Sequence, residues 1–280
     1  MFKDDFNINQ INLGKVVKTV RASIKKSIFY LGANIPYDYS ESLVKVYSSG
    51  LQKYLDKNGK RIKEVVELDA KIRYCDDILD DQLSKIRPKP IKKMKEIINL
   101  FQVEVPMASE VAQLFLLEVD IVNKSFSEQL LKEKILNIIN IRPCDFFVLA
   151  KVIIKNFGTS VSEQDFKYSW DFFVEFQRIR DLMDDIMSVE EDLLKKDYNS
   201  VIIAKKNKIS YHFFEDIIFE KISNLKFIIS KIQKHPYKDV FIESIDFWEK
   251  QYSVLFKKLL VDYYVDLDEF KKSYFIIKQL

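Results

Sequence analysis

The hydrophobic positions recur every three or four residues over most of the chain, which is the period of amphipathic helices. This pattern predicts helices over about 15–31, 40–56, 60–84, 91–102, 107–123, 127–140, 144–157, 163–196, 209–233 and 239–263, with a short terminal helix near Leu267. No segment alternates with a period of two between hairpin turns. The pattern therefore predicts an all-α protein.

Glycine and proline mark the predicted breaks between these helices. Gly32 and Pro36 separate the first two helices, and Pro88 stands where the third helix must stop. Pro143 suits the first turn of a helix, and Gly158 closes the helix that follows. Because there is no internal repeat, linker or shift in composition, we expect residues 1–280 to form a single domain.

The composition allows a large apolar core. Of 280 residues, 48% are hydrophobic and 14% are aromatic, so the aromatic rings either fill the core or line a pocket. Lys and Arg total 45 against 42 for Asp and Glu, and this balance gives no indication of a nucleic-acid partner.

Several features favour a cytoplasmic protein. Cys75 and Cys144 are too few for a disulfide framework and have no zinc-site spacing. The N-terminus is acidic and polar, without the pattern of a signal peptide. No uncharged apolar run of about 18 residues suggests a membrane span.

The first acidic cluster consists of Asp76, Asp77, Asp80 and Asp81 within the helix predicted over 60–84. Asp76 and Asp80 share one helix face, as do Asp77 and Asp81, and each such pair of like charges costs a few tenths of a kcal/mol, roughly. Mg²⁺ would compensate this repulsion, since it prefers carboxylate oxygens and phosphate. A solvated acidic face is the alternative.

The second cluster lies in the helix predicted over 163–196. Asp184, Ser188 and Asp192 recur every four residues, so their oxygens form one stripe that can chelate a hard cation. Arg180 precedes Asp184 by one turn and could contact a diphosphate or neutralise Asp184. An exposed, salt-bridged face is the alternative for this cluster.

Taken together, the two clusters predict a specific chemistry. If the helices face each other across a bundle, their carboxylates form a cage for several metal ions. An allylic diphosphate held there could lose its diphosphate, leaving a carbocation that an apolar, aromatic pocket protects from water.

These motifs resemble the class I terpene synthases of the trans-isoprenoid diphosphate synthase superfamily. Asp76-Asp77-x-x-Asp80 is similar to their first aspartate-rich motif, DDxxD. Asp184-Asp185-Ile186-Met187-Ser188-x-x-x-Asp192 is similar to their second metal motif, (N/D)DxxSxxxE, with Asp in place of the final Glu. The resemblance implies that Asp184, Ser188 and Asp192 bind one Mg²⁺, that Asp76 and Asp80 bind the others, and that three ions occupy the site. Asp77 would be a further catalytic carboxylate.

The same resemblance implies contacts to the diphosphate. Lys195-Lys196-Asp197-Tyr198-Asn199 is similar to the basic segment that trails the second motif, so Lys195 and Lys196 would bind the diphosphate, with Tyr198 and Asn199 as additional site residues. Arg142 precedes the second cluster at about the separation where terpene synthases carry a diphosphate-sensing arginine. Arg180 would be a further diphosphate contact.

A second branch, the squalene and phytoene synthases, is also similar. Arg73-x-x-Asp76-Asp77-x-x-Asp80-Asp81 and Arg180-Asp181-x-x-Asp184-Asp185 resemble its paired motifs, and the segment 27–32 resembles its N-terminal Ser-Phe-Tyr segment. This likeness adds Arg73, Asp81, Asp181 and Asp185 to the candidate site. The chain-elongating prenyl diphosphate synthases form a third branch, from which Arg180 departs because that branch has Asp there.

We therefore expect an all-α, single-domain bundle of the class I isoprenoid synthase type with a central active-site cavity. The favoured function is that of a Mg²⁺-dependent terpene synthase, a lyase that ionises a prenyl diphosphate and cyclises or deprotonates the carbocation. The alternatives are a prenyltransferase that joins two prenyl diphosphates and a non-catalytic helical subunit. A homodimer stays open.

Overall fold

A computed structural model describes residues 13–35, 64–73, 109–195 and 198–264. Every regular element in these ranges is an α-helix, which confirms the all-α class for the described part of the chain. The helices predicted over 40–56 and 91–102, most of 60–84, and the terminal helix near Leu267 fall on residues outside these ranges.

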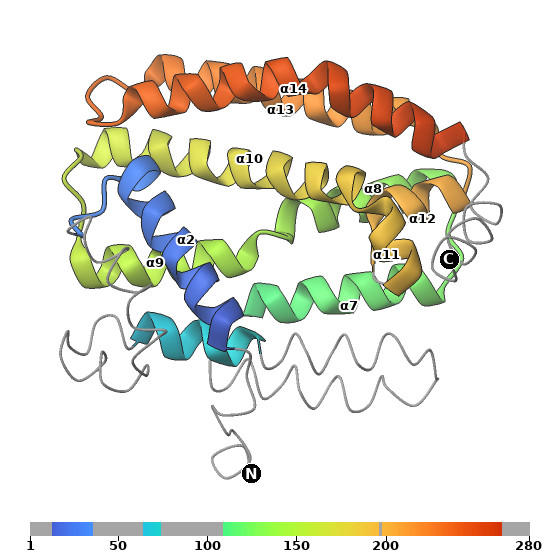
Figure 1. Ribbon diagram of the computed structural model, residues 1–280, viewed down its shortest axis with the longest axis horizontal. Helices are drawn as coiled ribbons and strands as arrows, with labels where there is room; N and C mark the ends of the chain where they lie inside the picture. Colours follow the sequence, from blue (N-terminus) through green and yellow to red (C-terminus); the bar gives the residue numbers. More distant parts are fainter. Residues whose placement is uncertain (1–12, 36–63, 74–108, 196–197, 265–280) are drawn as a thin grey trace, which may run out of the picture.

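The described helices follow the predicted spans closely. Residues 64–73 form one of them, drawn in cyan in Figure 1. The others are α2 (Leu13–Leu31), α7 (Ser109–Asn123), α8 (Glu128–Ile141), α9 (Cys144–Phe157), α10 (Glu163–Met187), α11 (Val189–Lys195), α12 (Ser200–Lys206), α13 (His212–Lys231) and α14 (Lys238–Tyr264). A search of the described residues finds no helix with the length and apolar character that a membrane crossing requires.

Two features of the helices were not predicted from the sequence. The helix predicted over 163–196 is divided at Ser188, which ends α10 with φ −100° and ψ 6°. The short helix α12 was not predicted, because seven residues are too few to show a helical period. Its start is nevertheless marked by Asn199, whose side-chain oxygen accepts hydrogen bonds from the backbone N–H groups of Val201 and Ile202.

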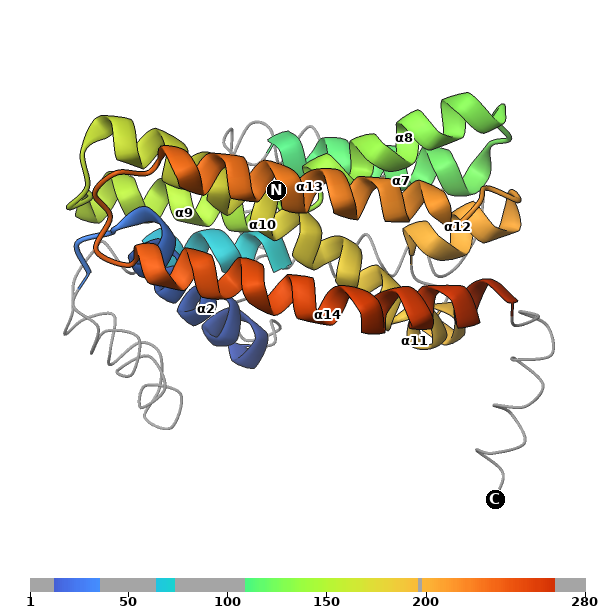
Figure 2. The same ribbon diagram turned by 90° about the horizontal axis from the view of Figure 1, so that it is seen from above.

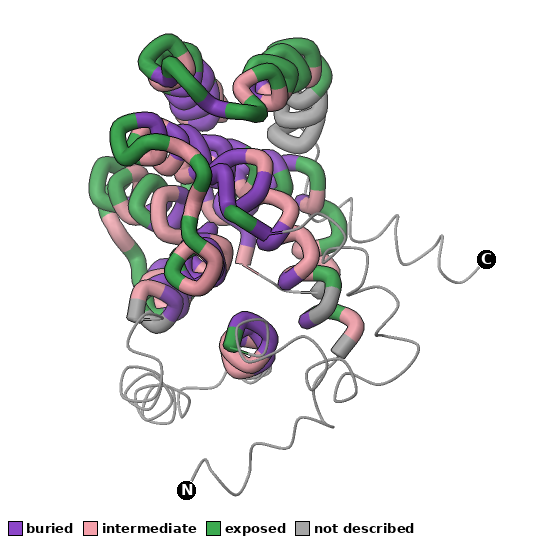
Figure 3. The backbone as a smooth tube through the Cα atoms, turned by 90° about the vertical axis from the view of Figure 1, so that its left-hand side faces the viewer, coloured by how far each residue is buried: buried purple, intermediate pink, exposed green. Residues whose placement is uncertain are grey.

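Helix α10 lies at the centre of the bundle. In Figure 1, α13 and α14 form a layer above it, whereas α2, α9 and α7 lie below it. Figure 2 shows α13 and α14 running lengthwise over α10, and both helices contact it. The buried residues gather in the middle of the molecule, and the exposed residues cover the outer sides (Figure 3). Residues of α10 therefore lie between the two layers.

A cluster of aromatic rings joins three helices at the core. Tyr30 of α2 packs against Phe172 and Phe176 of α10 and Phe241 of α14. Phe172 and Phe241 are fully buried and stack with ring centroids 4.5 Å apart. Burial of each such ring contributes about 1.5–3 kcal/mol, so this cluster fixes α2 against α10 and α14.

The loops that follow α2 and α9 are hydrogen-bonded to each other. Asn34 N donates to Gly158 O at 3.1 Å, and Ser160 N donates to Gly32 O at 2.9 Å. Thr159 Oγ1 donates to Leu31 O at 2.8 Å. Gly32 has φ +62°, a left-handed conformation that favours glycine. We refer to residues 32–34 and 158–160 as the α2–α9 clasp.

The start of α10 is connected to the loop between α13 and α14. Ser162 caps the helix, its Oγ accepting a hydrogen bond from Asp165 N at 3.1 Å. The buried carboxylate of Asp165 accepts hydrogen bonds from Gln233 N at 2.7 Å and from Lys234 N at 3.3 Å. Burial alone would raise the pKa of Asp165, but these hydrogen bonds outweigh it and lower the pKa.

Candidate functional site

A cavity of about 400 Å³ lies at the C-terminal part of α10, between residues 64–73, α7, α9 and α11. We call it the first cavity. Its apolar wall consists of Ile72, Val111, Leu114, Phe115, Cys144 and Phe146. Its polar wall consists of Arg73, Glu118, Arg142, Asp145, Arg180, Asp181, Asp184, Asp192 and Tyr198. Apolar residues and closely spaced opposite charges thus line the same cavity.

Many of the residues predicted for the site line this one cavity: Arg73, Arg142, Arg180, Asp181, Asp184, Asp192 and Tyr198. They come from segments more than a hundred positions apart in the sequence. Ser188, Asp185 and Asn199 do not line the cavity but contact residues that do. Asp76, Asp77, Asp80, Asp81 and Lys196 lie outside the described residues, and the side chain of Lys195 is not described either.

Asp185 is buried behind the cavity wall and paired with a cation. Its side chain is only 1% exposed, and it accepts hydrogen bonds from Arg142 Nη1 and from Ser200 N, the latter at 3.0 Å. Burial outweighs these contacts and leaves the pKa of Asp185 raised. For Arg142, burial lowers the pKa, but the carboxylates around it reverse the sign and raise it. Arg142 is thus held at the cavity by its ion pair with Asp185.

The stripe predicted for the second cluster persists across the end of α10. Ser188 N donates to Asp184 O at 2.8 Å, and Asp192 N donates to Ser188 O at 2.9 Å, so helical bonding continues from α10 into α11. Ser188 Oγ donates to Asp192 Oδ2 at 2.5 Å, and Asn199 Nδ2 donates to the same oxygen at 2.8 Å. Asp184 is exposed and lines the cavity. The hydroxyl of Ser188 and the carboxylate of Asp192 are therefore adjacent, and Asp184 lines the same cavity as Asp192.

Asp181 is a carboxylate of the cavity lining whose pKa is strongly perturbed. Burial, aided by the nearby Asp145 carboxylate, raises the pKa of Asp181 to about 7. The positive charges of Arg142, Arg180 and Lys26 oppose this shift. Near neutral pH the group can therefore gain or lose a proton, a property typical of functional sites.

Lys26 of α2 is a residue that the sequence reasoning missed. Its Nζ donates to Gln177 Oε1 at 2.6 Å and lies 3.6 Å from the centre of the Phe146 ring, which lines the cavity. The guanidinium of Arg180 lies 5.8 Å from the centre of the same ring. Burial, reinforced by the charge of Arg180, lowers the pKa of Lys26 to about 7. The only sequence signal was its position directly before the segment 27–32.

Arg73 is held in place at the cavity by two carboxylates. Its Nη2 donates to Asp145 Oδ2 at 2.8 Å, and its Nε lies 3.6 Å from Oδ1 of the fully buried Asp69. Asp69 precedes it by one helical turn, whereas Asp145 belongs to α9. The contact with Asp145 fixes the end of the helix 64–73 against α9. In the sequence, the first acidic cluster begins three residues after Arg73.

The donor set fits part of a magnesium site. Asp184, Asp192 and Ser188 offer carboxylate and hydroxyl oxygens, which are the ligands that Mg²⁺ prefers. Within the described ranges, no group of three or more His, Cys, Asp or Glu side chains could hold a metal ion by itself. A complete site would therefore need further oxygens from the substrate or from the first acidic cluster.

Comparison of the chain with models of protein families, with curated proteins and with solved structures found no match. The site must therefore be interpreted from its own residues.

Proposed function

We propose that the chain is a Mg²⁺-dependent class I isoprenoid synthase that ionises a prenyl diphosphate. The observation that supports this most is the convergence of Arg73, Arg142, Arg180, Asp184 and Asp192 on one cavity that also has an apolar wall. A prenyl diphosphate has the matching form, with a highly charged head and a long apolar tail.

The charged wall would hold the diphosphate. Arg180 donates to no carboxylate among the described residues, so its guanidinium can bind a phosphate oxygen. Asp184 and Asp192 would hold Mg²⁺, with Ser188 Oγ turning from Asp192 towards the ion. Bound Mg²⁺ would neutralise the diphosphate as it leaves with the electron pair of the C–O bond.

The apolar wall would hold the hydrocarbon and protect the cation. Phe115 and Phe146 line this wall together with Leu114 and Ile72. Their surfaces exclude water, which would otherwise trap the allylic cation as an alcohol. The π face of Phe146 already has the ammonium of Lys26 against it, which is the type of contact that also stabilises a carbocation.

Two fates of the cation are possible. In the terpene synthase the cation cyclises or loses a proton, and the stripe of Asp184, Ser188 and Asp192 favours this candidate. In the second candidate the enzyme joins two prenyl diphosphates. That candidate is favoured by Arg73 and Arg180, the arginines of the two paired motifs, because both line the cavity.

Incubation of the purified chain with farnesyl or geranylgeranyl diphosphate and Mg²⁺, with and without isopentenyl diphosphate, tests the proposal. A hydrocarbon made from one allylic substrate supports the terpene synthase. A product that contains two allylic units, or a longer diphosphate, supports the prenyltransferase. If no substrate releases diphosphate in a Mg²⁺-dependent manner, the chain is better described as a non-catalytic helical subunit and the proposal fails.

A pair of variants makes the test specific to the cavity. Asp184→Ala should abolish diphosphate release with little loss of stability, because the exposed carboxylate makes no hydrogen bond that the described fold needs. Glu190→Ala removes an exposed carboxylate of α11 that does not line the cavity, so this control should keep full activity. Full turnover in Asp184→Ala would contradict the metal-binding role.

A further inference from the structure

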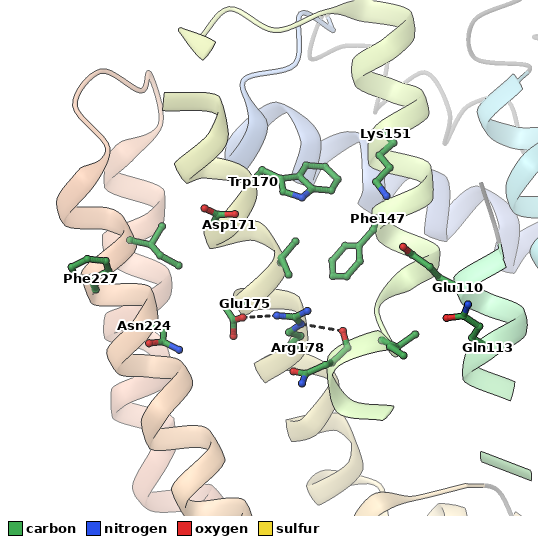
Figure 4. A pocket seen from close by; sticks show the side chains of 14 residues that line it. Glu110, Gln113, Phe147, Lys151, Trp170, Asp171, Glu175, Arg178, Asn224 and Phe227 are labelled. Carbon is green, nitrogen blue, oxygen red and sulfur yellow. Dashed lines mark hydrogen bonds and ion pairs between the residues drawn. The ribbon is translucent and has the colours of Figure 1, made fainter. Parts of the chain in front are cut away.

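A second cavity, of about 670 Å³, lies nearer the N-terminus of α10 and is lined by residues of α7, α8, α9, α10 and α13 (Figure 4). It is separate from the first cavity. Consecutive residues of α9 divide the two, since Phe146 lines the first cavity and Phe147 lines the second. Glu110 and Val111 of α7 divide them in the same manner. The volume is in the range of small-molecule sites.

Aromatic rings form the middle of this second cavity. Figure 4 shows Phe147 of α9 and Trp170 of α10 next to each other, with Phe227 of α13 on the far wall. The Phe147 and Trp170 rings are tilted by 55°, with centroids 6.3 Å apart. Phe227 is 64% exposed, and the ammonium of Lys231 lies 4.9 Å from its ring centre. Three aromatic rings thus line the cavity.

Two carboxylates at this cavity lack a cationic partner among the described residues. Glu175 instead has two cationic partners, since Arg178 Nη1 lies 2.5 Å and Lys221 Nζ 3.0 Å from its oxygens, and this group carries one net positive charge. Glu110 and Asp171 form no ion pair within the described part of the chain, and they stand on opposite sides of the two rings (Figure 4). Lys151, which is exposed, and Arg178 are the positively charged residues that line the cavity.

Asp171 and Trp170 also belong to a neighbouring hollow of about 660 Å³, formed by the first turns of α10. Its wall includes a further aromatic ring, Phe166, whose centroid lies 6.3 Å from that of Trp170. The indole and the carboxylate therefore stand where two hollows meet, and a ligand in either hollow would contact them. This makes both residues the most informative positions to change.

We propose that the second cavity binds an organic ammonium ion, with Trp170 and Phe147 contacting its alkyl groups and Asp171 balancing its charge. A cation over an aromatic face is held by the ring quadrupole, and this contact strengthens where water is excluded. A quaternary ammonium suits such a site because it needs no hydrogen-bond acceptor. Binding at this cavity does not depend on the function proposed for the first cavity.

Choline and 3,3-dimethylbutan-1-ol provide a direct test, because the two have almost the same shape but only choline carries a charge. Titration calorimetry with the full chain should show binding of choline and at least tenfold weaker binding of the neutral alcohol. Asp171→Asn should weaken choline binding about threefold, and Trp170→Leu about tenfold. Asp171 is exposed, so its variant tests the proposal even if Trp170→Leu unfolds.

Two further variants separate the proposal from its alternatives. Lys151→Met removes a competing cation and should tighten choline binding about twofold, whereas a site for an anion would lose its ligand in this variant. Asp246→Asn, an exposed acid of α14 away from the cavity, should leave binding unchanged. Equal affinity for choline and the alcohol, no binding of either, or no effect of Asp171→Asn would overturn the proposal.

Discussion

Replacement of Arg142 by Met should destabilise the fold, because it leaves the Asp185 carboxylate buried without its cation. The side chain of Asp185 is 1% exposed, and it also accepts hydrogen bonds from the side chain of Ser200 and from Ser200 N, the latter at 3.0 Å. Removal of one partner of a buried ion pair costs about 3–5 kcal/mol. Arg142 itself is 26% exposed and lines a cavity that water can enter, so we expect the lower end, about 3 kcal/mol.

The reverse change should cost less. Asp185→Asn keeps the side-chain volume and the oxygen that accepts from Ser200, while the freed guanidinium of Arg142 can turn towards the first cavity. We expect a loss of about 1 kcal/mol. The double variant, Arg142→Met with Asp185→Asn, should therefore be more stable than Arg142→Met alone, because it has no buried charge left unpaired.

The pH dependence has a definite sign. The pKa of Asp185 is raised in the folded protein, so the folded state holds the proton of this group more tightly than the unfolded state does. The contribution of Asp185 to the free energy of unfolding therefore falls as the pH rises. Without Arg142 the pKa should rise further. The deficit of Arg142→Met should therefore be larger at about pH 8 than at about pH 5, because protonation of the folded carboxyl relieves it.

Urea denaturation followed by circular dichroism at these two pH values measures the effect. The urea concentration at the unfolding midpoint should fall, while the slope of the free energy of unfolding against urea concentration should stay unchanged. The temperature of the thermal midpoint should fall by roughly 6–10 °C at the higher pH. A variant within 1 kcal/mol of the wild type, or a deficit that grows on acidification, would refute the assignment of a buried, charged Asp185.

Two further predictions concern the connections of the bundle. Asp165→Ala should lower the free energy of unfolding by about 2 kcal/mol at pH 6, because it removes the acceptor for Gln233 N. The pKa of Asp165 is lowered in the folded protein, so the stability that this carboxylate gives is lost as it protonates, and the effect of the variant should shrink below pH 3.8. Urea unfolding at both pH values checks this. Gly32→Ala should cost about 2 kcal/mol in thermal melts, because φ is +62° and the added Cβ would lie 2.8 Å from Val161 Cγ1. Gly158 has φ +72°, but a Cβ added there would meet only Asn34 Nδ2, at 3.7 Å, so Gly158→Ala should cost about half as much. An equal cost in the two variants would show that the contact with Val161 does not add to the cost of Gly32→Ala.

The elements that carry local signals were predictable from the sequence. The helix expected over 144–157 has the bounds of α9, because Pro143 and Gly158 mark its ends in the sequence itself. The division at Ser188 was not predictable, since the helical pattern and the backbone hydrogen bonds both continue through it. The start of α12 is marked only by one capping residue, Asn199, and the seven residues that follow are too few to show a helical period.

The candidate site was predictable only in part. Asp184 and Asp192 were found because their spacing along one helix can be read directly, and both line the first cavity. Lys26 could not be found in this manner, since its contact with Gln177 joins residues 151 positions apart. The pairing of Arg142 with Asp185 was missed for the same reason, and the role of Arg142 towards a diphosphate stays a prediction.

The α2–α9 clasp also sets the rotation of α2 about its own axis. Because the loop after α2 is fixed to the loop after α9, the helix cannot slide or turn without breaking the hydrogen bonds of Gly32 and Asn34. Deletion of one residue between Lys26 and Gly32 would turn the lysine by about 100° and shift it by about 1.5 Å. The segment is therefore intolerant of changes in its length, in addition to the constraint that the buried Tyr30 places on its sequence.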